Sequence, residues 1–145
     1  MALNSADVKK LLQDHDLGIL IIRIAIGGAM IAYGVPKFMN GGEYLAKVGE
    51  SMGFLGVRFA PLFWGFLAAL AEVMGGFMIL AGFLFRPAAA ALAFTMFVAA
   101  VSQFHAIDVS AGKTFTATVL HPLSYMGVFL GLLFAGPGKW SIQKH

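Results

Sequence analysis

Long apolar stretches alternate with short polar ones along this chain, and each apolar stretch has the length of a membrane-spanning helix. The four stretches cover about residues 17–39, 62–85, 87–107 and 116–135. A helix rises about 1.5 Å per residue, so roughly 20 residues cross a hydrocarbon core about 30 Å thick. The pattern predicts an all-α fold, an integral membrane four-helix bundle that forms a single transmembrane domain over residues 1–145.

The connection from 40 to 60 is polar and rich in glycine, unlike the four spans. Its apolar residues share one helical face, and an amphipathic segment of this kind lies in the headgroup region of a bilayer. We therefore predict an interfacial loop, placed to cap a cavity opening. The residues on this face are Tyr44, Leu45, Val48, Met52 and Leu55.

Composition supports the membrane assignment and excludes several other classes of protein. The chain is 59% hydrophobic and only 12% charged, whereas soluble domains carry about 25% charged residues. The net charge is +3, but the basic residues form no stripe, so the expected partner is the lipid bilayer and no nucleic acid is expected. The chain has no cysteine, which excludes disulfides, thiolate metal sites and thiol–disulfide chemistry.

Four crossings place both termini on one side of the membrane. Lysine and arginine at the ends of the spans and beyond them favour the cytoplasmic side. Five of these residues fall on the side of the termini and four on the other. This bias predicts cytoplasmic termini. The five are Lys9, Lys10, Arg86, Lys139 and Lys144, and the four are Lys37, Lys47, Arg58 and Lys113.

Two charged residues fall inside predicted spans, Arg23 and Glu72. A charge in hydrocarbon is costly, so it must be neutralised, paired or exposed to a wet interior. Lanes of small residues accompany both and allow two helices to approach closely. We predict an intramembrane ion pair between Arg23 and Glu72. One interpretation is a pair that fixes helix register, and the other is a carboxylate that takes up protons or contacts a ligand.

A second polar cluster is predicted at the membrane interface opposite the termini. Lys37 ends the first span, His105 lies near the end of the third, and His121 lies near the start of the fourth. Helical spacing adds Ser102 to the His105 face and Tyr125 to the His121 face. These five residues are titratable or polar and reachable from the bilayer, so they are candidates for a quinone or other ligand site.

Three interpretations of the two histidines remain open. They cap loops and bind headgroups or backbone, or they hold a quinone headgroup and couple its reduction to proton movement. In the third, His105 and His121 ligate haem b between helices, but no other haem signature supports this one. The sequence has no HExxH motif, histidine-rich tract or acidic pair at metal-ligand spacing, so no metal centre is predicted.

The predicted fourth span contains Gly127 and Gly131 at small-xxx-small spacing. This spacing is typical of close helix contact. It predicts a contact either within the chain or between two copies, and hence a possible homo-oligomer.

Three stretches of the sequence resemble the DoxX family of small four-helix membrane proteins. They occur in the family's order and cover the first two spans, the start of the third and the C-terminal end. The stretches are IIRIAIGGAMIAYGVPKF with Arg23, Gly27, Gly34 and Lys37; AEVMGGFMILAGFLFRPAAAAL with Glu72, Gly75, Gly76, Gly82 and Arg86; and GPGKWSI with Gly136, Gly138, Lys139 and Ser141.

The resemblance implies a bacterial or archaeal cytoplasmic (inner) membrane protein with both termini inside. It also implies association with quinone-linked or oxidative-stress redox systems, and so with redox-enzyme subunits as partners. The leading hypothesis is a membrane subunit of such a system that binds quinone. It assigns no catalytic residue and is at most one part of an oxidoreductase complex. The alternatives are a non-catalytic scaffold for soluble partners and a small-solute or proton pathway.

Overall fold

The computed structural model describes residues 14–143. The long helices are α2 (His15–Met39), α4 (Pro61–Ala81), α5 (Phe85–His105) and α7 (Leu120–Ala135). Three short helices join them, namely α3 (Gly41–Gly49), η1 (Glu50–Leu55) and α6 (Phe115–Thr118), with a single turn η2 (Val109–Ala111) between α5 and α6. The predicted all-α membrane fold is confirmed, since α2, α4 and α5 are each long and apolar enough to cross a membrane.

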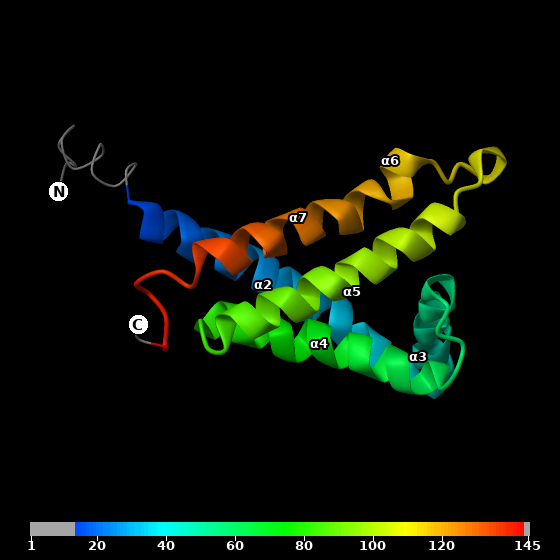
Figure 1. Ribbon diagram of the computed structural model, residues 1–145, viewed down its shortest axis with the longest axis horizontal. Helices are drawn as coiled ribbons and strands as arrows, with labels where there is room; N and C mark the ends of the chain where they lie inside the picture. The colour runs from blue at the N-terminus through cyan, green and yellow to red at the C-terminus, as the bar shows by residue number, and fades with distance from the viewer. Residues whose placement is uncertain (1–13, 144–145) are drawn as a thin grey trace.

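The long helices run lengthwise along the molecule, while α3 stands across one end (Figure 1). The turn between α4 and α5 lies at the other end, together with the start of α2 and the C-terminal segment. Helix α2 packs against α4, α5 packs against α7, and α4 and α5 pack against each other. Both described ends therefore lie on the same side, as an even number of crossings requires.

The fourth predicted span is interrupted. Helix α7 has 16 residues, fewer than a straight crossing needs, and α6 precedes it after a single residue, Val119. The backbone of Val119 is nonetheless helical, and its carbonyl accepts from the N–H of Leu123. Pro122 has no N–H to donate to Thr118, which explains the break. Together α6 and α7 extend over about 30 Å, enough for the fourth crossing.

The turn between α4 and α5 comes a few residues earlier in the sequence than predicted. Helix α4 ends at Ala81 because Gly82 adopts a left-handed conformation, with a φ of 67°, that terminates the helix. Arg86, which separates the predicted spans 62–85 and 87–107, lies with Pro87 in the first turn of α5 instead. Proline is accepted there because the first N–H groups of a helix have no partner within it.

Glycines bring α2 and α4 into backbone contact. A methyl group added at Gly27 would lie 2.9 Å from the carbonyl oxygen of Gly76, and one added at Gly34 would lie 2.9 Å from Cβ of Glu72. The predicted pairing of the two small-residue lanes is therefore confirmed. The two helices run antiparallel, with Gly34 against Glu72 and Val73, and Gly27 against Gly76 and Leu80.

Gly127 and Gly131 make no such contact. Apart from the adjoining residues and backbone of α7 itself, no atom of residues 14–143 lies within 4 Å of a methyl group built at either position. The predicted contact within the chain is therefore wrong for residues 14–143, and contact with a second copy stays a prediction.

Two adjacent glycines of α2 provide a matched test of this packing. We expect Gly27→Ala to lower the free energy of unfolding by about 1–3 kcal/mol, because the new methyl group meets α4 backbone that cannot move away easily. Gly28→Ala should be neutral or slightly stabilising, since nothing lies within 4 Å of that position and alanine favours the helix. Thermal unfolding in one detergent measures both. Equal stability of the two variants would contradict the register.

Candidate functional site

The polar centre of the bundle is an ion pair between Lys37 and Glu72. Lys37 lies in the last turn of α2, and Glu72 lies in the middle of α4. The ammonium Nζ is 2.6 Å from Oε1 of the carboxylate. The Glu72 side chain is only 3% exposed and that of Lys37 19%, so the lysine stem reaches inward from the end of its helix. The ion pair therefore lies beside the middle of α4.

The predicted pair between Arg23 and Glu72 is corrected by this geometry. The Arg23 guanidinium donates to the carbonyls of Ile79 and Leu80, seven and eight residues from Glu72 along α4. Seven residues correspond to about 10 Å along the axis, which is too far for a direct contact. Glu72 is paired with Lys37 instead, because Lys37 lies one turn beyond Gly34.

Arg23 is 1% exposed and binds backbone carbonyls. Its Nε donates to Ile79 at 2.9 Å and its Nη2 to Leu80 at 2.6 Å, both near the C-terminus of α4. Its Nη1 donates to Pro137 and Trp140 of the C-terminal segment, each at 2.8 Å. Carbonyls at a helix C-terminus carry partial negative charge, which favours a cation there. Arg23 therefore joins three parts of the chain without a carboxylate.

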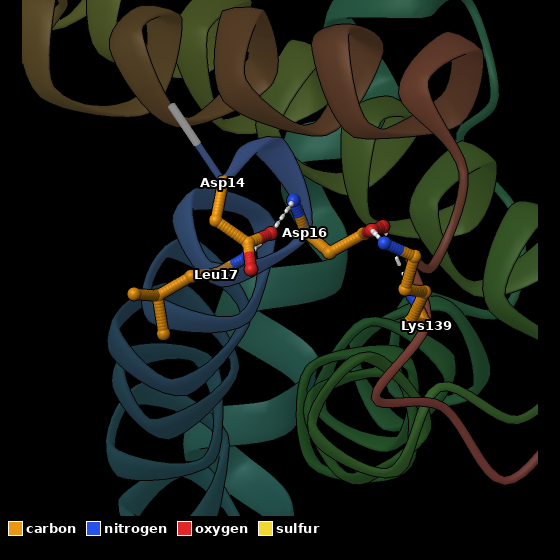
Figure 2. Close-up of polar contacts among 4 residues, drawn as sticks. All are labelled: Asp14, Asp16, Leu17 and Lys139. Atoms are coloured by element: carbon orange, nitrogen blue, oxygen red, sulfur yellow. Dashed lines mark hydrogen bonds and ion pairs between the residues drawn. The ribbon is translucent and has the colours of Figure 1, made fainter. Parts of the chain in front are cut away.

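The same end of the bundle is closed by further contacts of the C-terminal segment. The N–H groups of Ile142 and Gln143 donate to the carbonyls of Ala81 and Gly82. Lys139 binds Asp16 in the first turn of α2, with Nζ 2.8 Å from Oδ2, while its backbone N–H donates to Oδ1 (Figure 2). The bond to Asp16 holds the pKa of Lys139 above its ordinary value. Asp14 accepts from the N–H groups of Asp16 and Leu17 and so caps α2.

A cavity of about 260 Å³ lies between α2 and α7 on one side of the ion pair, and we call it the α2–α7 cavity. Tyr33 from α2 crosses it, with its hydroxyl 3.2 Å from Nε2 of His121. The ring of Tyr125 packs against both, with centroids 6.0 Å from Tyr33 and 4.5 Å from His121. The cavity is lined by Tyr33, Lys37, Glu72, Met96, Ala99, Gln103, Ala117, Thr118, His121, Pro122 and Tyr125.

Three of the five predicted ligand-site residues meet in the α2–α7 cavity: Lys37, His121 and Tyr125. The other two do not line it. His105 is exposed, its Nδ1 lies 2.8 Å from the carbonyl of Val101, and its ring stacks on Phe54 of η1. Ser102 accepts from the hydroxyl of Ser51, a contact that ties α5 to η1. The prediction that His105 and His121 share one site is therefore not supported by their positions.

Sequence reasoning missed Tyr33 and Gln103, which also line the cavity. Tyr33 is four residues before Lys37 on α2, so the two share a face. This spacing could have identified Tyr33 as a neighbour of Lys37 from the sequence alone. Its partner His121 is 88 residues away, and only the packing of α2 against the rest of the bundle brings the two together.

A second cavity, of about 300 Å³, lies on the other side of the ion pair, and we call it the α4–α5 cavity. Its walls come from α4 and α5, and α3 and η1 contribute Val48, Gly49, Ser51 and Met52. Helix α3 reaches this position by backbone contact, since a methyl group at Gly65 would lie 1.7 Å from the carbonyl oxygen of Leu45. Lys37 and Glu72 line this cavity as well as the first, so the ion pair lies between the two.

The described residues offer hydrogen-bonding groups for an organic ligand and no metal site. Within residues 14–143, no three His, Asp or Glu side chains come close enough together to hold a metal ion. The α2–α7 cavity combines an ammonium, an imidazole and two phenols. These groups can donate to ligand oxygens and exchange protons with them.

Comparison with known proteins agrees with the fold and with the membrane location. No solved structure matches the chain. The chain is 30% identical over 132 residues to the inner membrane protein YphA of Escherichia coli (strain K12). The alignment covers 87% of this chain and 88% of that protein. The DoxX family model matches residues 18–106, a range that includes Arg23, Lys37 and Glu72 but ends before α7. The chain therefore belongs to the DoxX family.

Proposed function

We propose that this chain is the quinone-binding membrane subunit of a redox system, with the quinone headgroup in the α2–α7 cavity. The observation that carries the proposal is the convergence of Lys37, His121 and Tyr125 on one cavity. These residues come from two helices far apart in the sequence, and a ligand between them would receive hydrogen bonds from opposite sides. A quinone ring needs such an arrangement because its two carbonyl oxygens lie at opposite ends.

The position and size of the cavity support the same ligand. Tyr33 and His121 are exposed on the outer surface of the bundle, which faces lipid in a spanning protein. A volume of about 260 Å³ is near the lower end for small-molecule sites. It suits one substituted ring, with the isoprenoid tail leaving between α2 and α7 into the bilayer.

Reduction of a quinone to a quinol takes two electrons and two protons. His121 is the group suited to pass protons, because one ring nitrogen of a neutral imidazole accepts a proton while the other donates one. The electrons would come from a partner redox enzyme docked at the membrane. In this proposal the chain holds the quinone and the partner performs the oxidation of the donor.

Orientation follows from the charges. With cytoplasmic termini, Arg86 and Lys139 would lie on the cytoplasmic side with the α4–α5 turn, and the α2–α7 cavity would open nearer the opposite surface. Lys9, Lys10 and Lys144, which contributed to this prediction, lie outside the described residues. Accessibility of single cysteines introduced at Ser110 and Ser141, in intact cells, would test the orientation.

Two histidine variants test the quinone site. We expect His121→Phe to weaken the binding of a short-tailed quinone about threefold to tenfold, the effect of one lost hydrogen bond. His105→Phe should leave binding unchanged, because His105 lies outside the cavity. The measurement is quinone titration of the purified protein in lipid nanodiscs, followed by calorimetry. Equal affinity in both variants, or no saturable binding, would contradict the proposal.

A further inference from the structure

The α4–α5 cavity has no role in the proposed quinone site, although it is the larger of the two. Small side chains create it, since Ala68 and Ala71 of α4 face Ala91 of α5. Met52 of η1 also lines it. Most of its lining is apolar, and its polar side chains are those of Lys37, Ser51, Trp64, Glu72 and Thr95. Lys37, Ser51 and Thr95 have hydrogen-bond partners, whereas Trp64 and Glu72 each carry a buried polar atom without one.

The two atoms are Oε2 of Glu72 and Nε1 of Trp64. Both are buried and lack a hydrogen-bond partner among residues 14–143, and they are the two side-chain atoms of that part of the chain in this condition. Glu72 as a whole is only 2% exposed. A buried donor or acceptor without a partner is costly and is rare in folded proteins. Trp64 and Glu72 both line one cavity, which favours a ligand there that satisfies these two atoms.

The spacing of the two residues describes the ligand. Trp64 and Glu72 are eight residues apart on α4, and both side chains line the cavity. Eight residues correspond to about 12 Å along the helix axis. The ligand must donate a hydrogen bond at the Glu72 end, because a carboxylate only accepts, and must accept one at the Trp64 end, because an indole N–H only donates.

The charge of the lining indicates an uncharged ligand. Among the described residues that line the cavity, Lys37 and Glu72 alone are charged, and they neutralise each other at 2.6 Å. A charged ligand would be buried here without a counter-ion, at high cost. The volume of about 300 Å³ admits only a small molecule.

We propose that the α4–α5 cavity binds an uncharged, two-ended amphiphile from the bilayer. Its hydroxyl group donates to Oε2 of Glu72, and a second oxygen, about two helical turns away, accepts from Nε1 of Trp64. The site does not depend on the quinone site, although both cavities share Glu72. Together with the proposed quinone site, this chain would have two ligand sites.

The test uses octane α,ω-diol as the probe, since the separation of its two hydroxyls is similar to the rise of about 12 Å along the helix axis between the two residues. Trp64 and Trp140 are the two tryptophans of the sequence, so a Trp140→Phe protein reports on Trp64 alone. We expect a saturable shift of Trp64 emission to longer wavelength in nanodiscs. Octane α,ω-dimethyl ether, which cannot donate, should bind about tenfold more weakly or less. Butane α,ω-diol should also bind more weakly, because it cannot reach both atoms.

Variants locate the site, with ligand-induced stabilisation against heat as the readout. Ala71→Leu fills the α4–α5 cavity and should abolish diol binding, and Ala91→Leu fills it from the opposite wall if the first variant folds poorly. Ala117→Leu, in the α2–α7 cavity, should leave diol binding unchanged. Trp64→Phe should weaken diol binding about threefold to tenfold without affecting quinone titration.

Three results would overturn the proposal. The first is the absence of saturable diol binding, which would mean that water satisfies the two atoms. The second is equal binding of the diol and its dimethyl ether, and the third is undiminished binding in both Ala71→Leu and Ala91→Leu. Loss of quinone binding in His121→Phe is a separate measurement, so either proposal can fail alone.

Discussion

Arg23→Leu is expected to be the most destabilising single substitution in the described bundle. It removes the donors for four carbonyls, which belong to Ile79, Leu80, Pro137 and Trp140. Hydrogen bonds to charged groups contribute about 1.5–3 kcal/mol each, and buried backbone groups in a membrane protein have no water to replace them. We expect a loss of more than about 4 kcal/mol in the free energy of unfolding, measured by thermal or denaturant unfolding in detergent.

Two further variants sharpen this prediction. Arg86→Leu removes an exposed arginine at the same end of the molecule and should have little effect. Arg23→Lys keeps the charge but replaces a planar group with five donors by a single ammonium with three. Its free energy of unfolding should therefore lie between those of the unsubstituted protein and Arg23→Leu. Hydrogen exchange should rise in the C-terminal segment of Arg23→Leu. Stability equal to that of Arg86→Leu would contradict the role assigned to Arg23.

The second large loss of stability is expected when the ion pair is broken, and it should be larger for removal of Lys37 than for removal of the Glu72 charge. Lys37→Ala leaves a carboxylate that is 3% exposed without its cation, and breaking a buried pair in this way costs about 3–5 kcal/mol. Glu72→Gln should cost less, because the Lys37 side chain is 19% exposed and can turn toward water or headgroups. Unfolding of both proteins in the same detergent measures the difference.

The double variant Lys37→Ala with Glu72→Gln distinguishes a pair from two independent residues. Removing both charges leaves nothing uncompensated, so the double variant should be more stable than Lys37→Ala alone. Lys47→Ala, at an exposed lysine of α3, controls for the loss of a positive charge. Additive effects of the two substitutions would mean that Lys37 and Glu72 are not coupled.

The class of fold could be predicted from the sequence because hydrophobic length alone identifies spans. The close approach of α2 to α4 was also predictable, since small residues at helical spacing mark such contacts. The helix limits were less accurate around Gly82 and Pro122. There the backbone conformation of single residues decides where a helix stops, and hydropathy carries no information about it.

The candidate site was only partly predictable. Arg23 and Glu72 were recognised as buried charges, but their partners depend on register, and a shift of two helical turns separates the predicted pair from the observed one. Backbone carbonyls as partners of Arg23 leave no trace in the sequence at all. Lys37 was placed at an interface because it ends a span, whereas its flexible stem allows the charge to lie deeper than the backbone.

The carbonyl partners of Arg23 also impose an order on biogenesis. Arg23 enters the membrane with the first helix, but two of its partners, Pro137 and Trp140, come 114 and 117 residues later. At about 5–20 residues per second, translation of that interval takes roughly 6–23 s. Throughout this time the guanidinium must be held by lipid phosphates, by water or by the insertion machinery. Helix α2 therefore enters the bilayer early but reaches its final environment only when the C-terminal segment has been synthesised.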